Sequence, residues 1–388
     1  MKIILNCESV RHPLTGIGNY TFHLLRGLAE CKDCELYTFS HLKIIPGASL
    51  LQEHEAERKP PHKGVPRMRC WGRSLPCAYP LRARVVDLAF RYQTRAYSHE
   101  AVYHEPNFIL KPFDGISITT IHDLSWIHYP QFHPRERITY MERSFPPTRQ
   151  RASHFITDSE YVKSEMTSIL GIPPHQITAV PLGVSAEFSP RSHRELEPCL
   201  NHYGLKIKKY ILSVGTLEPR KNLAGLLDAY MSLPSKQRKR FPLVMVGGKG
   251  WCSTSLEQRI RTLEQKGEVR HLDYVPGCDL PMLYAGATAF VFPSIYEGFG
   301  LPPLEAMASG VPVITSSATA MEEVVGDAGL LVPAQDTERL YAALENLLSD
   351  SDLRRSLSAK GVERAAAFTW ERCIAATLEV YRTQRSAL

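Results

Sequence analysis

The sequence predicts an α/β protein with two doubly wound domains, each built around a parallel sheet. Short apolar runs alternate with longer amphipathic stretches up to about residue 188, and the same alternation restarts near residue 209. Alternation of this kind is typical of parallel strands joined by helices that cover both faces of a sheet. The length of 388 residues agrees with two domains, because a single core rarely grows beyond about 250–300 residues.

In the first half, each expected element follows from a change in apolar periodicity. Strands are expected at 2–6, 35–39, 116–121, 154–157 and 176–180, and helices at 19–30 and 161–170. Asp158 or Ser159 is the expected N-cap of the second helix, and Gly171 is expected to end it. The polar stretch 189–203 lacks clear periodicity, so we interpret it as a linker.

The second half repeats the pattern. Strands are expected at 210–214, 243–246, 269–272, 289–292 and 311–315, and helices at 222–233, 255–265, about 302–309, 337–348, 352–368 and 370–382. The sequence therefore predicts a first domain at 1–188 and a second at 200–369, each with a Rossmann-like sheet.

Bulk composition excludes several classes of protein. Hydrophobic residues make up 44% and charged residues 22%, as in ordinary globular proteins. The formal net charge of +6 is too small to indicate nucleic-acid binding, and we expect none. Nine cysteines at scattered spacings favour free thiols in a reducing compartment. No signal peptide and no apolar run of 18 residues are visible, so we expect a cytoplasmic protein without a membrane span.

The segment EGFGLPPLE carries two carboxylates, Glu297 and Glu305, around a glycine-rich turn. The turn at 298–300 lies between a predicted strand and a helix whose first turn accommodates Pro302. Free backbone N–H groups and the positive end of the helix dipole attract anions at such a place. Glu305, expected in the first turn, could simply compensate the dipole, whereas both carboxylates could also bind hydroxyl groups beside a bound phosphate.

A second motif, VGTLEPRKN, places Arg220 and Lys221 just before a helix that Asn222 is expected to cap. Two cations at such a turn can neutralise a diphosphate, although they could also be a solvated pair. Both motifs follow strands of the second domain at their carboxyl ends, where open α/β sheets bind ligands.

The first domain offers weaker candidates. Gly16 and Gly18 precede a predicted helix, but a third glycine of a dinucleotide fingerprint is missing, so a dehydrogenase is disfavoured. His122 directly follows the strand at 116–121 and could contact a reacting centre, or form a His–Asp pair that holds a loop. His104 and Glu105 could line the same cleft.

Residues 58–95 form a basic segment with interleaved aromatic residues. It holds ten Lys or Arg residues and a single acid, Asp87. Such a run can be a solvated face. It can equally be a patch for anionic lipid or for a phosphate-bearing acceptor.

In this order, the motifs resemble the family-four glycosyltransferases, which have the two-domain GT-B fold. The resemblance extends over almost the whole chain, and EGFGLPPLE is its most specific element. The segments IHDLSWIHYPQFHP and ITDSEYVKSEM are most similar to the bacterial O-antigen mannosyl- and rhamnosyltransferase branch. The fold also implies that the last helix, within 370–388, crosses back onto the first domain, which would bind the acceptor.

The resemblance implies retaining transfer of a sugar from a nucleotide diphosphate. It assigns the diphosphate to Arg220 and Lys221, the ribose to Glu305 and the nucleobase to Val275. The backbone of the glycine-rich turn would position the donor sugar together with Glu297, and His122 would lie near the anomeric carbon. The implied donor-binding residues are Gly16, Gly18, Arg220, Lys221, Val275, Gly298, Phe299, Gly300, Leu301 and Glu305, with Glu297 and His122 as catalytic residues.

The implied co-substrate is a nucleotide sugar, GDP-mannose or GDP-D-rhamnose by the branch resemblance, and no other cofactor or metal is expected. No second carboxylate is placed as a nucleophile, which favours front-face attack. The implied acceptor is a polyprenyl-diphosphate-linked glycan at the inner face of the cytoplasmic membrane. Two alternatives of the same fold stay open: a non-hydrolysing nucleotide-sugar epimerase, and a catalytically inactive sugar-nucleotide-binding protein.

Overall fold

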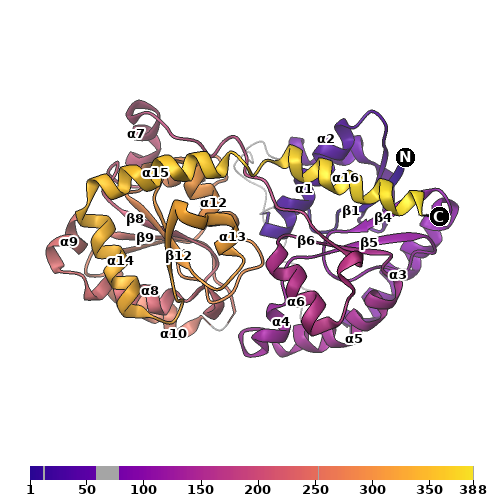
Figure 1. Cartoon of the computed structure of the whole chain (residues 1–388), viewed down its shortest axis with the longest axis horizontal. Helices are drawn as coiled ribbons and strands as arrows, with labels where there is room; N and C mark the ends of the chain where they lie inside the picture. The colour runs from indigo at the N-terminus through magenta and orange to yellow at the C-terminus, as the bar shows by residue number, and fades with distance from the viewer. Residues whose placement is uncertain (12–13, 58–77, 252, 388) are drawn as a thin grey trace.

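The computed structural model describes all residues except 12–13, 58–77, 252 and 388. Two α/β units lie side by side along the long axis of the molecule, each with one sheet between helices (Figure 1). The predicted fold class is therefore confirmed. Among the described residues, no helix combines the length and apolarity that crossing a bilayer requires.

The first unit contains a seven-stranded sheet. Its spatial order is β3-β2-β1-β4-β5-β6-β7, and every pair is parallel except β2 with β3. The strands are β1 (Lys2–Asn6), β2 (Glu35–Ser40), β3 (Lys43–Pro46), β4 (Ala101–Glu105), β5 (Ile116–Ile121), β6 (His154–Thr157) and β7 (Ile177–Ala179). The central strands β4 and β5 are buried along their whole length, as parallel strands covered on both faces should be.

The helices around this sheet were only partly expected. They are α1 (Gly16–Glu30), α2 (Gly47–Glu57), α3 (Ala78–Thr94), α4 (Ser125–His128), α5 (Arg135–Arg151) and α6 (Glu160–Leu170). Helix α1 begins three residues before the expected start, because Thr15 caps it by accepting the N–H of Gly18. Helix α5 was not predicted, since Pro146 and Pro147 interrupt its pattern. Ser159 caps α6 and Gly171 ends it, as predicted.

The second unit contains a fully parallel, six-stranded sheet in the order β10-β9-β8-β11-β12-β13. Its strands are β8 (Ile211–Val214), β9 (Leu243–Val246), β10 (Val269–Leu272), β11 (Ala289–Phe292), β12 (Val313–Ser316) and β13 (Gly329–Val332). Its helices are α7 (His193–His202), α8 (Leu223–Ser232), α9 (Ser235–Arg240), α10 (Thr254–Glu264), α11 (Leu280–Gly286), α12 (Leu301–Ala308), α13 (Met321–Val325), α14 (Thr337–Ser349) and α15 (Ser351–Ala365).

The interpretation of 189–203 as an irregular linker was wrong. Helix α7 occupies most of it and packs against α11 of the second unit. A capping box starts the helix. The Ser192 hydroxyl accepts the backbone N–H of Glu195, and the Glu195 carboxylate accepts the backbone N–H of Ser192. Leu196 and Leu200 are its buried residues. Two buried leucines in ten residues were too few to reveal a helical periodicity in the sequence.

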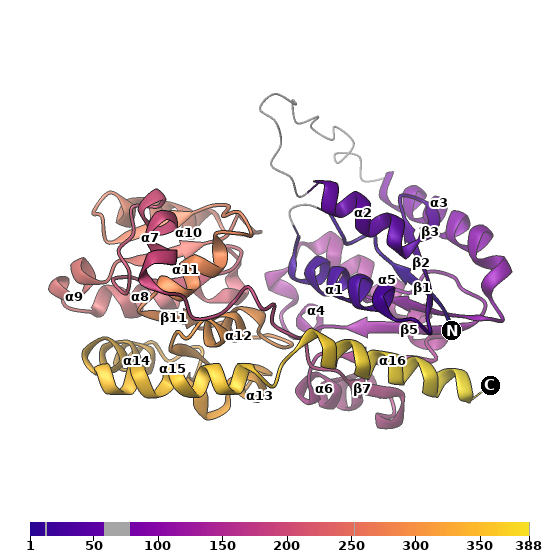
Figure 2. The same cartoon turned by 90° about the horizontal axis from the view of Figure 1, so that it is seen from above.

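The last helix, α16 (Trp370–Ser386), leaves the second unit and lies along the first, next to α1 (Figures 1 and 2). Gly27 permits this close approach, since a Cβ there would come within 2.0 Å of Ile374. Tyr381 is fully buried, and its hydroxyl bonds Nδ1 of His104 at 2.6 Å. The helix therefore belongs to the core of the first unit, as expected from the resemblance.

We expect Tyr381→Phe to lower the free energy of unfolding by about 1–3 kcal/mol. The substitution leaves a buried ring nitrogen of His104 without its partner. Burial lowers the pKa of His104 to about 3, so protonation near neutral pH does not compensate for the loss. Urea unfolding followed by circular dichroism would measure the change. Tyr274→Phe is the matched control, because Tyr274 is 67% exposed and should change little. Equal effects of both variants would contradict this role for Tyr381.

Candidate active site

The two motifs of the second unit meet at the carboxyl ends of neighbouring strands. Strands β8 and β11 pair directly, so the loops that follow them lie side by side. Lys221 Nζ lies 2.5 Å from Glu297 Oε1, and Arg220 Nη1 lies 2.9 Å from Glu297 Oε2. One carboxylate is thus clamped between two cations, which we call the Glu297 cluster.

The Glu297 cluster is nearly closed to solvent, with its three side chains 12–13% exposed. Burial alone would raise the pKa of Glu297, but Arg220 and Lys221 outweigh it and the pKa lies below its ordinary value. Burial lowers the pKa of Lys221, opposed only in part by the carboxylate. Glu297 therefore neutralises the two cations that were expected to bind a diphosphate.

Further contacts fix this geometry. Ser294 donates to Glu297 Oε1 at 2.5 Å, and Arg220 Nη1 donates to the carbonyl of Tyr296 at 2.8 Å. The ammonium of Lys221 lies 4.9 Å from the ring centre of Phe292. Asn222 is the N-cap residue of α8 as expected, but its side chain makes no capping hydrogen bond, and its amide N–H donates to the carbonyl of Ala334.

Two carboxylates near Arg220 were not assigned a role from the sequence. Glu218 Oε2 lies 3.9 Å from Arg220 Nη2, and Asp123 approaches from the first unit. Burial would raise the pKa of Asp123, but Arg220 and hydrogen bonds from Ser125 bring it below its ordinary value. Glu218 could have been found from the sequence, because it lies two residues before Arg220 in the segment LEPRK. Asp123 could not, because only folding brings it close to Arg220.

The glycine-rich turn at 298–300 leads into α12 as predicted. Gly300 is the N-cap, with a φ of 114° that favours glycine. The helix starts at Leu301, and its next two residues, Pro302 and Pro303, have no N–H. Amides that could bind an anion therefore come from the turn and from Leu301, not from the rest of the first helical turn.

Glu305 lies in the second turn of α12, so its expected place in the first turn was wrong. Burial raises the pKa of Glu305 to about 7, and the nearby Tyr284 hydroxyl opposes part of this shift. No cation balances it among the described residues. Dipole compensation in the first helical turn therefore does not explain this carboxylate.

His122 forms a His–Asp pair, but its partner is Asp158, which follows β6, and not the adjacent Asp123 of the alternative interpretation. Its Nδ1 lies 2.8 Å from Asp158 Oδ2, and its Nε2 lies 2.8 Å from the carbonyl of Pro106. Both partners accept hydrogen bonds. Burial would lower the pKa of His122, but Asp158 and the carbonyl outweigh it, so the pKa is raised. Because both ring nitrogens are engaged, the ring suits a positioning role better than proton transfer.

The two units touch directly at the glycine-rich turn. Ser159, the N-cap of α6, donates to the carbonyl of Gly298 at 2.8 Å, and a Cβ on Gly298 would lie 1.7 Å from the carbonyl oxygen of His122. Tyr296 adds a second contact, since its hydroxyl accepts the N–H of Leu124 at 2.9 Å. The structure therefore shows a closed arrangement of the two units.

The remaining candidates occupy different surroundings. Val275 is 7% exposed after β10, and Phe299 packs edge-on against Phe368. Gly16 and Gly18 lie inside the first turn of α1 instead of preceding it.

The expectation that His104 and Glu105 line the cleft was wrong. Both are buried beneath it, His104 between Tyr381 and Thr120, and Glu105 bonded by Asn6 and Tyr103.

Comparison with known proteins decides the family. Residues 14–188 match the model described as Glycosyltransferase Family 4, and residues 203–364 match Glycosyl transferases group 1. The O-antigen chain mannosyltransferase B of Escherichia coli is 38% identical over 387 residues, which cover 98% of this chain and all of that protein. The chain belongs to the family-four glycosyltransferases. The resemblance drawn from the motifs is thereby confirmed.

Solved structures agree on the fold of this glycosyltransferase. Sucrose-phosphate synthase from Thermosynechococcus elongatus superposes with a TM-score of 0.73 at 22% identity, covering 100% of both chains. Anabaena HepE, solved with UDP and glucose, also gives 0.73, at 18% identity over 99% of this chain and 100% of that one. Within the described ranges, no group of His, Cys, Asp and Glu side chains could hold a metal ion.

Proposed function

We propose that this glycosyltransferase moves a hexose, mannose or D-rhamnose, from a GDP-sugar to a polyprenyl-diphosphate-linked glycan in O-antigen synthesis. The Glu297 cluster carries the proposal, because it joins two cations and a carboxylate beside the amides of the glycine-rich turn. The name of the Escherichia coli relative supports the sugar and the pathway. The complex of Anabaena HepE with UDP and glucose supports a nucleotide-sugar donor.

Donor binding would exchange partners within the cluster. The diphosphate takes Arg220 and Lys221 from Glu297, and the released carboxylate accepts hydrogen bonds from donor-sugar hydroxyls. Charge-assisted bonds of this kind are strong in a nearly closed site. The exchange leaves every buried charge either ion-paired or hydrogen-bonded, which avoids the large penalty of an isolated one.

Departure of the nucleoside diphosphate places negative charge on its phosphates. Arg220, Lys221 and the turn at 298–301 are already positioned to stabilise this charge, so we propose transfer without a metal. The developing oxocarbenium-like centre would face Glu297, and the acceptor would attack from the side of the leaving group with retention. His122 would position the glycine-rich turn, because its carbonyl lies against Gly298.

The remaining donor contacts follow the family pattern. Glu305 would hold the ribose hydroxyls and Val275 the nucleobase. Gly16 and Gly18 would approach the phosphates from the first unit. We further propose that the enzyme rests on the inner face of the cytoplasmic membrane through residues 58–95, of which 58–77 lie outside the described residues.

A donor panel tests the proposal. The enzyme is incubated with GDP-, UDP- and dTDP-sugars, with and without a lipid-linked glycan, and free nucleoside diphosphate and product anomers are measured. We expect a GDP-sugar to give free GDP, and only when the acceptor is present. The product should keep the anomeric configuration of the donor, and EDTA should leave the rate unchanged. Sugar converted without acceptor would favour an epimerase. Loss of activity in EDTA that magnesium restores would refute the metal-free step.

Donor affinity should rise with pH through about 7. Ribose hydroxyls need an ionised Glu305, whose pKa is raised to about 7, so protonation at lower pH removes the acceptor. Between pH 8 and pH 6 we expect the dissociation constant of the nucleotide sugar to increase about tenfold. Calorimetric titration with the intact sugar donor measures this, since its diphosphate does not titrate in this range. Glu305→Gln should bind more weakly and lose this pH dependence; an unchanged profile would exclude Glu305 as its source.

A further inference from the structure

Helix α3 has apolar side chains on two opposite faces. One face packs into the first unit, where Phe90 is fully buried against Phe39 and Tyr103. Val85, Leu88 and Tyr92 follow one another at three- and four-residue spacing on the other side and are 50%, 69% and 84% exposed. We call these three residues the α3 stripe. The solvent face of a surface helix is normally polar, so an apolar stripe on that face indicates a binding surface.

The stripe is part of a larger concentration of exposed apolar surface. In the described part of the chain seven large hydrophobic side chains are exposed, and four gather here: the α3 stripe and Leu42. The other three, Ile169, Tyr274 and Val362, belong to separate elements. Scattered exposed hydrophobics are normal, whereas a contiguous patch marks an interaction site.

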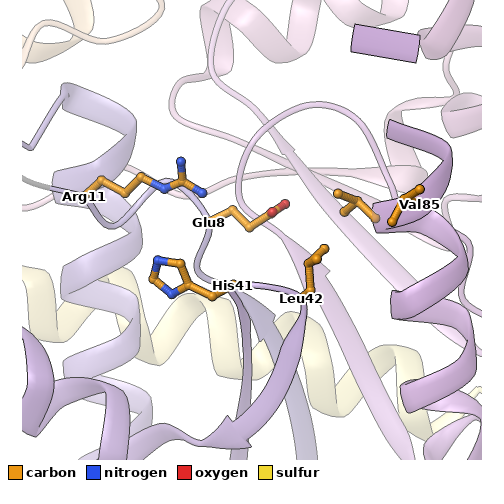
Figure 3. A pocket seen from close by; sticks show the side chains of 6 residues that line it. Glu8, Arg11, His41, Leu42 and Val85 are labelled. Atoms are coloured by element: carbon orange, nitrogen blue, oxygen red, sulfur yellow. The ribbon is translucent and has the colours of Figure 1, made fainter. Parts of the chain in front are cut away.

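A pocket of about 290 Å³ opens beside the stripe. Arg11 and His41 lie on one side of it, Leu42 and Val85 on the other, and Glu8 between them (Figure 3). Lys111 holds the Glu8 carboxylate at 2.8 Å and compensates its charge. Arg11 forms no ion pair with any residue that the structure describes. The pocket therefore combines the positive charge of Arg11 with an apolar wall that continues into the α3 stripe.

The surroundings supply further positive charge on an outward-facing side. Lys43 and Arg95 are both exposed near the carboxyl end of α3, where Gln93 bonds the backbone on either side of Lys43. Helix α3 lies on the side of the first unit opposite α16, away from the second unit (Figure 2). An apolar stripe rimmed by cations is the arrangement with which proteins rest on anionic bilayers.

We propose that the α3 stripe and the Arg11–His41 pocket dock the enzyme on an anionic phospholipid bilayer. The stripe enters the interfacial region, and the pocket receives a headgroup phosphate between Arg11 and His41. This inference deepens the proposed function, on which it rests for a membrane-bound acceptor. A protein partner fits less well, because stable interfaces bury about 800 Å² on each partner and need a larger surface than three side chains.

Sedimentation with vesicles tests the docking surface. Vesicles of phosphatidylglycerol and phosphatidylcholine are compared with vesicles of phosphatidylcholine alone. We expect the triple variant Val85→Ser, Leu88→Ser and Tyr92→Ser to bind the anionic vesicles at least about tenfold more weakly. Arg11→Ala should lose most of the preference for anionic lipid and keep the residual binding to neutral vesicles.

The matched control changes the three exposed hydrophobics that lie elsewhere: Ile169→Ser, Tyr274→Ser and Val362→Ser. It removes similar apolar surface, and we expect it to bind vesicles like the parent. Tyr92→Trp gives an independent readout, since its fluorescence should shift to the blue when anionic vesicles are added. Equal binding of both triple variants, or no shift, would overturn the proposal. So would lipid-free dimerisation that only the α3 triple variant loses.

Transfer to a water-soluble acceptor glycan separates this inference from the proposed function. The α3 triple variant should keep the parental rate in that assay, because the stripe lies outside the Glu297 cluster. If parent and variant both fail to transfer while vesicle binding still depends on the stripe, the proposed function fails and the docking surface stands. A variant that transfers normally and still binds vesicles fully leaves the function intact and removes the docking surface.

Discussion

Glu297→Ala is expected to reduce the rate of sugar transfer by about 10³-fold while nucleoside diphosphate binds at least as tightly as to the parent. The carboxylate is the group that would hold the donor sugar, whereas Arg220 and Lys221 remain to bind the phosphates. Removal of Glu297 even frees both cations from a competing partner. Steady-state kinetics and calorimetric titration with GDP measure the two effects separately.

The same substitution should reduce stability when no ligand is present. Two cations that are nearly buried lose their shared carboxylate, and breaking such a pair costs on the order of 3–5 kcal/mol. Added nucleoside diphosphate should restore much of the melting temperature in Glu297→Ala, and more than it raises that of the parent. Glu297→Gln is the companion variant, because it keeps the shape and removes the charge. Retained turnover in either variant would contradict the role of Glu297.

Gly298→Ala is expected to lower kcat by about 10²-fold with little change in the affinity for nucleoside diphosphate. A Cβ at this position would lie 1.7 Å from the carbonyl oxygen of His122, so the two units could not close as they do in the structure. Arg220 and Lys221, the cations that would bind the phosphates, lie within the second unit and would stay in place. Closure, not donor binding, is the step that this methyl group should block.

Gly277→Ala is the matched control, because a Cβ there meets nothing within 4 Å. Small-angle scattering with donor bound would show whether the variant stays open. Ser159→Ala removes the hydrogen bond to the Gly298 carbonyl and should also lower kcat, but by less than Gly298→Ala does. A Gly298→Ala enzyme with parental kcat would mean that contact between His122 and the turn is not needed for transfer.

Much of the fold could be predicted because its signals are local. The strands at 116–121, 154–157, 243–246, 269–272 and 289–292 have the predicted bounds. Apolar runs between polar loops, such as Leu243–Val246 and Ala289–Phe292, are typical of buried parallel strands. Elements with a weak period were missed. Helix α7 has two buried leucines, and α5 carries an internal proline pair.

The candidate site divides in the same way. Glycine-rich turns and paired cations after strands were visible as motifs, so Arg220, Lys221 and the turn at 298–300 were found. That Glu297 bridges both cations was not visible, because 76 residues separate it from Lys221. His104 and Glu105 were misplaced, since a polar residue at the end of a strand can point into the cleft or into the layer beneath it.

The sequence by itself determined the two parallel-sheet units, the position of the anion-binding turn and the residue types beside it, because periodicity and turn chemistry are encoded within a few neighbouring residues. Only the tertiary structure decided which charges neutralise one another, which glycine touches the opposite unit and which face of α3 stays uncovered. Those properties depend on atoms brought together from distant parts of the chain, and burial and charge pairing exist only after the chain has folded.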